Sequence, residues 1–166
     1  VVGFDSEYPP YGYVGDDGKF KGFDLDLAAE VAQRNGWDFE AQAIDWNAKD
    51  SLIEAGTITC LWNGFTMEGR ETDYAFSEPY MNNSQVIMVK AGSDIKTEAD
   101  LAGKNVLTQA GSAAETLLED DGADGKAALA ATFAGGKVNT IADYTNAVMQ
   151  LEAGAVDAIA CDSSIA

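Results

Sequence analysis

The chain contains no histidine, the side chain that most often serves as a general base or as a metal ligand in proteins. We therefore expect neither a metal nor another cofactor. Basic side chains are also few, because 10 Lys and Arg stand against 28 Asp and Glu, which gives a net charge of −18. Nucleic acids and anionic membrane surfaces would repel such a chain, so neither is an expected partner.

Cysteines and long apolar runs are scarce as well. Cys60 and Cys161 both lie in short apolar stretches, where small buried thiols are expected rather than a disulfide. No apolar run reaches the roughly 20 residues that a membrane-spanning helix needs. By contrast, 46% of the 166 residues are hydrophobic and 10% are aromatic, which is enough for one domain or two small lobes with a sizeable core.

The first half of the sequence alternates strands with helices, which is typical of α/β proteins. Phe23, Leu27 and Val31 recur at four-residue spacing, with Ala28 and Ala32 alongside, and predict an amphipathic helix that ends at Gly36. The GDDG sequence at 15–18 predicts the turn of a hairpin. The expected strands are 1–4, 11–14, 19–21, 37–43 and 59–62, and the expected helices are 23–35 and 47–55.

The second half repeats the alternation and predicts a second lobe. Tyr144, Val148 and Leu151 have helical spacing, and Gly154 ends that helix. The acidic loop at 119–126 lacks calcium-loop spacing and is expected to be a solvated turn. The expected strands are 85–89, 105–108 and 156–161, and the other expected helix is 112–119.

Residues 63–80, NGFTMEGRETDYAFSEPY, are the most informative segment because they place an arginine among neutral donors directly after an apolar strand. Arg70 can bind both oxygens of a carboxylate through its planar guanidinium, and Thr66 and the amides around Gly64 add further donors. The grouping suits a small carboxylate. The alternative is a solvated arginine beside Glu71 on a turn, since most surface arginines bind no ligand.

A zwitterionic ligand such as an amino acid also needs an anion for its ammonium group. Asp162 follows the apolar strand AIAC and is the candidate, although it could instead cap a helix beginning at Ser163. Glu-Ala-Gly precedes both this strand and the strand that ends near Asn63, which predicts two similar lobes. Both strands would present polar groups at their carboxyl ends, where ligands bind in open α/β sheets.

Three aromatic residues, Tyr8, Tyr11 and Trp46, lie in loops near the expected strand ends. An aromatic ring in such a place can stack on the side chain of a ligand. Packing within the core or the loops is the alternative, because aromatic residues are also the main fillers of cores.

Five motifs in order along the whole chain resemble the family 3, polar amino acid type of extracellular solute-binding proteins that serve ABC transporters. The motifs are YPPYGY (8–13), GKFKGFDLDLA (18–28), NGFT with Arg70 and FSEPY (63–80), DLAGKNVLTQAGSA (100–113) and LEAGAVDAIACD (151–162). The resemblance implies a type II periplasmic-binding-protein-like fold of two α/β lobes, each a mostly parallel sheet flanked by helices. Lobe 1 would comprise residues 1–84, the hinge crossing 85–90 and lobe 2 91–166.

The same resemblance assigns ligand contacts to positions of this sequence. Arg70 would hold the α-carboxylate, beside Thr66 and the backbone of Ala113. Asp162 and the backbone near Gly64 would hold the α-amino group. The remaining positions, which would flank the ligand side chain or tune the polarity around it, are Tyr8, Trp46, Asp5, Asn63, Gln109 and Ser112.

The sequence departs from similar proteins in two ways. The stretch from Thr66 to Arg70 is one residue shorter than the common pattern, which puts the convergence of hydroxyl and guanidinium in question. The chain also stops at Ala166, whereas its relatives continue through the second lobe and complete the first. We therefore expect the C-terminal part of the fold to be absent and the first lobe to expose core surface.

The function implied is non-enzymatic. The protein would bind a free L-amino acid by hinge closure and deliver it to the membrane permease of an ABC importer. Asp5, Glu7 and Asp45 near the expected pocket disfavour an acidic ligand side chain and favour a polar or basic one. We expect a monomer outside the cytoplasm, in the periplasm or on the cell surface as a lipoprotein.

Two other classes stay open. Some similar proteins eliminate water or carbon dioxide from cyclic acids, and here Asp162 or Glu78 would have to act as the acid or base. The chain could also be the ligand-sensing module of a receptor or of a cell-wall enzyme. With no histidine to titrate, ligand affinity is expected to be nearly flat from about pH 6 to 8.

Overall fold

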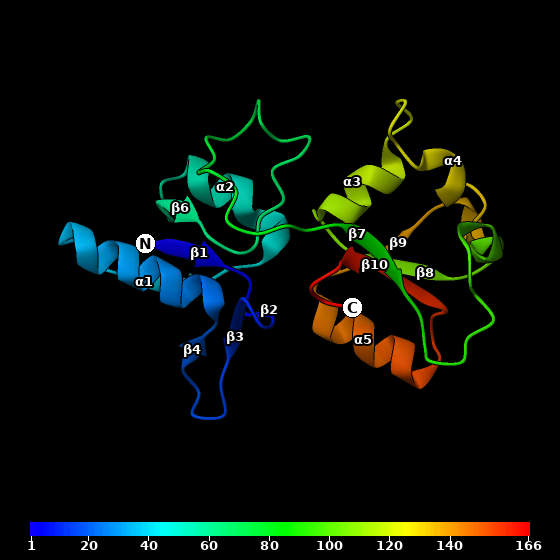
Figure 1. The fold of residues 1–166 in the computed structure, drawn as a ribbon, viewed down its shortest axis with the longest axis horizontal. Helices are drawn as coiled ribbons and strands as arrows, with labels where there is room; N and C mark the ends of the chain where they lie inside the picture. The colour runs from blue at the N-terminus through cyan, green and yellow to red at the C-terminus, as the bar shows by residue number, and fades with distance from the viewer. The chain divides into compact units, whose positions relative to one another are not determined.

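The structure, a computed structural model, describes residues 1–166 and divides into two compact units, Val1–Asn83 and Ser84–Ala166. Each unit has a central sheet and helices of its own (Figure 1), which confirms the expected α/β class. The expected hinge at 85–90 overlaps strand β7 (Gln85–Met88), which belongs to the sheet of the second unit. A hinge role for this stretch stays a prediction.

A short parallel sheet forms the centre of the first unit, with β1 as its middle strand. Val2 pairs with both Ala41 and Cys60, so the three strands are in register and their carboxyl ends meet at one edge. In Figure 1, β1 lies between the two α-helices of this unit. The elements are β1 (Val2–Phe4), β5 (Ala41–Ala43), β6 (Cys60–Leu61), α1 (Phe23–Asn35), the 3₁₀ helix η1 (Trp46–Ala48) and α2 (Lys49–Glu54).

The hairpin predicted near the N-terminus is present as part of a separate antiparallel sheet. It comprises β2 (Glu7–Tyr8), β3 (Gly12–Val14) and β4 (Phe20–Lys21). Gly22 joins this sheet to α1 with φ of 141°, and a Cβ atom there would lie 2.0 Å from the Tyr11 carbonyl oxygen. Only glycine permits this close approach of hairpin and helix.

Helix α1 has the predicted length and ends in a left-handed Gly36, and its buried face matches the prediction at Ala28 and Ala32 but not at Phe23 and Val31. Leu25, Ala28 and Ala32 are buried, whereas Phe23 and Val31 are 44% and 37% exposed. The helix carries apolar residues on more than one side. The side with Ala28 and Ala32 is the buried one, because these small side chains allow close packing. Four-residue spacing alone did not distinguish the two sides.

The strand predicted at 37–43 is shorter than expected. Trp37 and Phe39 are 65% and 38% exposed and lie outside β5. Since β1 has three residues, it pairs with only three residues of its neighbour, so the alternation before Ala41 has no strand to join.

A four-stranded sheet of order β7-β10-β8-β9 forms the second unit. The pair β7 and β10 is antiparallel, whereas β8 is parallel to both β10 and β9. The predicted strands and helices are all present, and β9 and α4 were not predicted. The further elements are β8 (Val106–Gln109), β9 (Asn139–Ile141), β10 (Ala158–Asp162), η2 (Glu98–Leu101), α3 (Ala113–Glu119), α4 (Ala127–Ala130), η3 (Ala134–Gly136) and α5 (Tyr144–Ala153).

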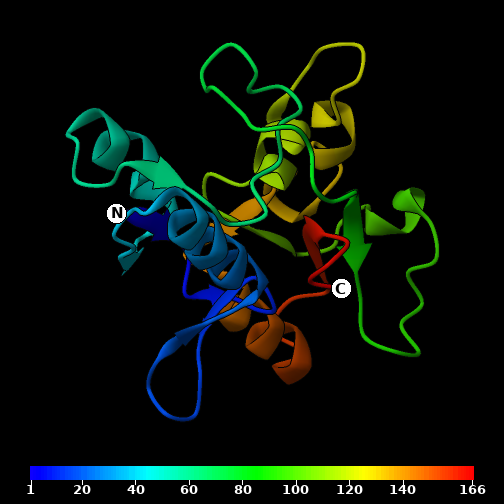
Figure 2. The same cartoon turned by 60° about the vertical axis from the view of Figure 1, so that its left-hand side comes forward.

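The core of the second unit lies on both faces of this sheet, because every residue of β8 and β10 is buried. In Figures 1 and 2, α3 and α5 lie on opposite sides of the sheet. Side-chain caps fix where these helices begin: the Ser112 hydroxyl accepts from the Glu115 amide, and the Asp143 carboxylate accepts from the Asn146 amide. The loop at 119–126 between α3 and α4 is mostly exposed, as predicted.

Both cysteines are free, as predicted, but only one is buried. Cys161 lies in β10, and burial together with the neighbouring Asp162 charge raises the pKa of its thiol to about 12. Cys60 is exposed, contrary to prediction, because it lies on β6 at an edge of its sheet. None of the helices combines the length and apolar character needed to cross a bilayer.

Candidate functional site

In the first unit, the carboxyl ends of β1 and β6 bring two predicted site residues together. The Asp5 amide donates to the Asn63 side-chain oxygen at 2.9 Å, and the Asp5 carboxylate accepts from the Glu7 amide at 2.8 Å. Both side chains are buried, with 5% and 4% exposed. These two hydrogen bonds therefore hold the loop after β1 to the loop after β6 and to the start of β2.

Two aromatic rings pack over the turn at Gly64. Tyr8 and Tyr11 are buried and stack with ring centres 5.4 Å apart. Gly64 has φ of 54°, and a Cβ atom there would lie 3.4 Å from Tyr8 Cε1. The Tyr11 hydroxyl also lies 2.8 Å from Met81 Sδ. Core packing, the alternative considered for these tyrosines, thus accounts for much of their surface.

Arg70 lies on an aromatic platform. Its guanidinium carbon is 4.9 Å from the centre of the Phe65 ring, and Trp46 meets the same ring edge to face at 5.2 Å. Tyr74 and Phe76 surround Phe65 from other sides. Sequence reasoning missed Phe65, since a single aromatic residue in a loop has no periodicity to reveal it.

Arg70 and Thr66 are joined through the main chain. Arg70 Nη1 donates to the Thr66 carbonyl at 3.2 Å, and the Thr66 hydroxyl accepts from Asn83 Nδ2 at 3.3 Å. Arg70 and Thr66 are thus each hydrogen-bonded to another residue of the first unit. Arg70 is half-buried and stacked, which distinguishes it from the solvated arginine considered as the alternative.

Segment 63–80 is fastened to α1 by a buried carboxylate that sequence reasoning also missed. The Tyr80 hydroxyl donates to Asp24 Oδ1 at 2.8 Å, and Asp24 is 0% exposed. Burial raises its pKa to about 6, although hydrogen bonds from Tyr80 and the Gly64 backbone act in the opposite direction. A sequence signal exists, because Asp24 lies four and eight residues before the buried Ala28 and Ala32.

In the second unit, the carboxyl end of β8 carries a buried polar cluster. The Thr108 hydroxyl donates to the Ala160 carbonyl at 2.9 Å and lies 3.1 Å from the Ser112 hydroxyl. Gln109 Nε2 donates to the Ala142 carbonyl at 3.1 Å. Ser112 is the N-cap of α3, and Ala113 is the first residue of that helix.

Asp162 is the last residue of β10 and is 7% exposed. Its Oδ1 accepts from Gln85 Nε2 at 2.6 Å, across the antiparallel pair of β10 and β7. Residues 163–165 form a turn in which the Ile165 amide donates to the Asp162 carbonyl. Both the ligand contact and the helix cap considered for Asp162 stay predictions.

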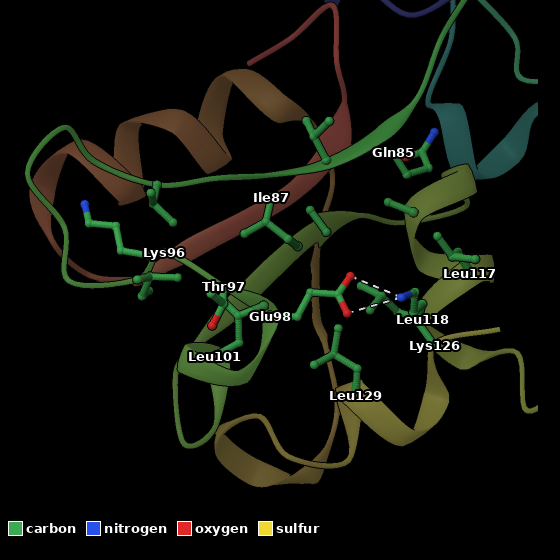
Figure 3. Close-up of a pocket in the computed structure, with 15 residues that line it drawn as sticks. Gln85, Ile87, Lys96, Thr97, Glu98, Leu101, Leu117, Leu118, Lys126 and Leu129 are labelled. Atoms are coloured by element: carbon green, nitrogen blue, oxygen red, sulfur yellow. Dashed lines mark hydrogen bonds and ion pairs between the residues drawn. The ribbon is translucent and has the colours of Figure 1, made fainter. Parts of the chain in front are cut away.

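A pocket of about 390 Å³ lies in the second unit away from these residues (Figure 3). Apolar side chains such as Ile87, Leu101 and Leu118 line the pocket. Two further lining residues form an ion pair, in which the Lys126 ammonium lies 3.1 Å from the Glu98 carboxylate. None of the predicted ligand contacts lines this pocket. Gln85 lines the pocket and also donates to Asp162.

Comparison with solved structures identifies the class of fold. An ABC uptake transporter substrate-binding protein from Streptococcus pneumoniae, solved with bound histidine, has a TM-score of 0.90 at 34% identity over 98% of this chain and 65% of that chain. The ancestral amino acid-binding protein AncCDT-1, a precursor of cyclohexadienyl dehydratase, has a TM-score of 0.87 at 27% identity over 99% of this chain and 70% of that chain. The fold is thus that of substrate-binding proteins, as predicted.

The family is shown by sequence. Residues 1–141 match bacterial extracellular solute-binding proteins, family 3, and the chain belongs to that family. The L-cystine-binding protein TcyJ of Escherichia coli (strain K12) is 32% identical over 104 residues, which are 61% of this chain and 39% of that protein. The match therefore spans well under half the length of this curated relative.

Proposed function

We propose that the protein binds a free L-amino acid and delivers it to the membrane permease of an ABC importer. The observation that carries this proposal is the half-buried arginine of segment 63–80, held on the Phe65 ring within a chain of the extracellular solute-binding family. A guanidinium supported in this way suits a carboxylate. Membership of the family supplies the class of ligand and the transporter.

In this proposal both units contribute to the ligand. Arg70, with Thr66 and the Ala113 backbone, takes the α-carboxylate, and Asp162 with the Gly64 backbone takes the α-amino group. The side chain of the ligand lies against Tyr8 and Trp46. The ligand stabilises a closed state because it touches both units only there.

A polar or basic side chain is favoured over an acidic one. Asp5 follows β1, Glu7 begins β2 and Asp45 follows β5, and carboxylates in these places would repel an acidic ligand side chain. A histidine-bound structure and a cystine-binding protein among the relatives agree with this choice.

We infer further that the protein is a monomeric, extracytoplasmic binding protein rather than an enzyme, with or without a lipid anchor. Dehydratase chemistry would need a positioned acid or base. Asp162 Oδ1 is already engaged by Gln85, and Glu78 is exposed.

The test is a thermal-shift panel of the twenty L-amino acids on the protein, on Arg70→Ala and on Arg34→Ala. Ligand at about a hundred times its Kd adds roughly 2.7 kcal/mol of stability, which moves the melting temperature visibly. Arg34 is the matched control, because it is the other arginine of the chain and pairs with Glu30 on the surface.

A stabilisation by polar or basic amino acids that is lost in Arg70→Ala and kept in Arg34→Ala is expected. Removing the charged partner of a desolvated carboxylate should cost about 2–5 kcal/mol, or at least a thirtyfold rise in Kd. If no amino acid shifts the melting temperature, or if Arg70→Ala binds within a few-fold of the original, the proposal is wrong.

A further inference from the structure

Asp24 connects helix α1 to both ends of segment 63–80. Its carboxylate accepts from the Tyr80 hydroxyl at 2.8 Å, and the Gly64 backbone hydrogen-bonds the same carboxyl. The Tyr80 ring also packs beside Phe23 and Trp62, with ring centres 6.4 Å apart in each case. Residues between these two anchors include Thr66 and Arg70.

The connection is made by a group that is costly to charge. Asp24 is 0% exposed, and its Oδ2 atom has no hydrogen-bond partner. An ionised carboxylate in such a place retains one oxygen that neither protein nor solvent satisfies.

No neighbouring cation offsets this cost. Of the titratable groups around Asp24, only the Tyr80 hydroxyl contacts it, and no charged side chain contributes to its pKa. The hairpin strands β3 and β4 pack against α1, but Lys21 on β4 pairs with Asp17 instead. On α1 itself, Asp26 and Glu30 are exposed.

We propose that Asp24 is a positioning residue for the ligand-binding segment: with a neutral carboxyl it holds residues 63–80 on helix α1, and ionisation of that carboxyl favours opening of the segment. Opening lets water reach both carboxylate oxygens. The segment is therefore held most firmly in mild acid and is released progressively as the pH rises.

The direction follows from proton linkage. The pKa of Asp24 is about 6 when the segment covers it, against an ordinary value of 3.8, so the closed form binds the proton more tightly. The opening equilibrium should then rise roughly tenfold between pH 5 and 8. This titration falls in the window where the absence of histidine had predicted flat behaviour.

The test is amide hydrogen exchange by mass spectrometry on the ligand-free protein between pH 5 and 8, corrected for the intrinsic exchange rate. Peptides within 62–82 should show a tenfold rise in opening for the original protein and for Asp26→Asn. Asp24→Asn, which is neutral at every pH, should show none and should be the better protected at pH 8. Tyr80→Phe removes the hydroxyl alone and should open more at every pH.

Peptides from β1 and α5 give the reference for unfolding of each unit. The proposal is overturned if the opening of segment 63–80 in the original protein does not vary with pH. It is also overturned if exchange changes equally in all peptides of the first unit, because that would mean global unfolding. The inference rests on the proposed function only in naming 63–80 as ligand-binding. If L-arginine, L-histidine and L-cystine each leave exchange unchanged, the proposed function loses support while the ligand-free result still decides the role of Asp24.

Discussion

Replacing Asp24 by asparagine is expected to stabilise the first unit at neutral pH and to lose this advantage in acid. Asp24 is fully buried, and its pKa of about 6 lies above the ordinary 3.8 because burial disfavours the charged form. The folded unit therefore holds the proton more tightly than the unfolded chain does. The resulting stability is full below about pH 4 and is lost as the pH rises through about 6.

The magnitude follows from the two pKa values. Their separation of about two pH units corresponds to roughly 3 kcal/mol at pH 8, which asparagine avoids because it carries no charge. Its oxygen can still accept from the Tyr80 hydroxyl, but its amide nitrogen takes the place of Oδ2, which has no partner, and an unpaired buried donor costs about 1 kcal/mol. Asp24→Asn should therefore be about 2 kcal/mol more stable at pH 8, with the gain disappearing near pH 4.

Urea unfolding followed by tryptophan fluorescence measures this unit selectively. Trp37, Trp46 and Trp62 all lie in Val1–Asn83, and the second unit has no tryptophan. Asp26→Asn is the control, because Asp26 is exposed on the same helix and should give a constant offset across the pH range. If Asp24→Asn is less stable at pH 8, or if its difference from the original protein does not vary with pH, the argument from burial is refuted.

Two other outcomes follow from the second unit and the cysteines. Asp143→Ala should destabilise the second unit by about 1 kcal/mol, because the Asp143 carboxylate caps α5 by accepting from the Asn146 amide at 2.7 Å. Urea unfolding followed by circular dichroism measures this loss of stability, and an unchanged midpoint would contradict the cap. A maleimide at pH 7.5 should label Cys60 well before Cys161, because the Cys60 thiol is exposed whereas the Cys161 thiol is buried in β10. Burial raises the pKa of both thiols, and that of Cys161 reaches about 12. Mass spectrometry counts the labels, and two labels added at similar rates would show that β10 opens readily.

Local sequence rules account for most of the elements. Gly36 and Gly154 end helices in left-handed conformations as their positions predicted, and apolar runs located the strands of both sheets. These rules failed where a neighbouring strand decides whether a segment forms a strand. Trp37 and Phe39 alternate like a strand, but β1 is too short to pair with them.

The candidate site likewise contains features that the sequence predicted and features that it did not. The sequence predicted which polar residues follow strand ends, and the structure joins Asp5 to Asn63 there. The sequence could not reveal that Phe65 supports Arg70, or that Asp24 binds Tyr80 over a separation of 56 residues. Such contacts depend on how a loop folds back, which no periodicity encodes.

In the proposed binding site, the Phe65 ring has a consequence for the free energy of ligand binding. Because the guanidinium of Arg70 lies over this ring and also donates to the Thr66 carbonyl, much of the rotational freedom of a long side chain is already lost before a ligand arrives. An arginine that is ordered before binding loses less conformational entropy when the ligand binds, so more of the interaction energy appears as affinity. A lysine at position 70 would lack the planar group that makes this possible.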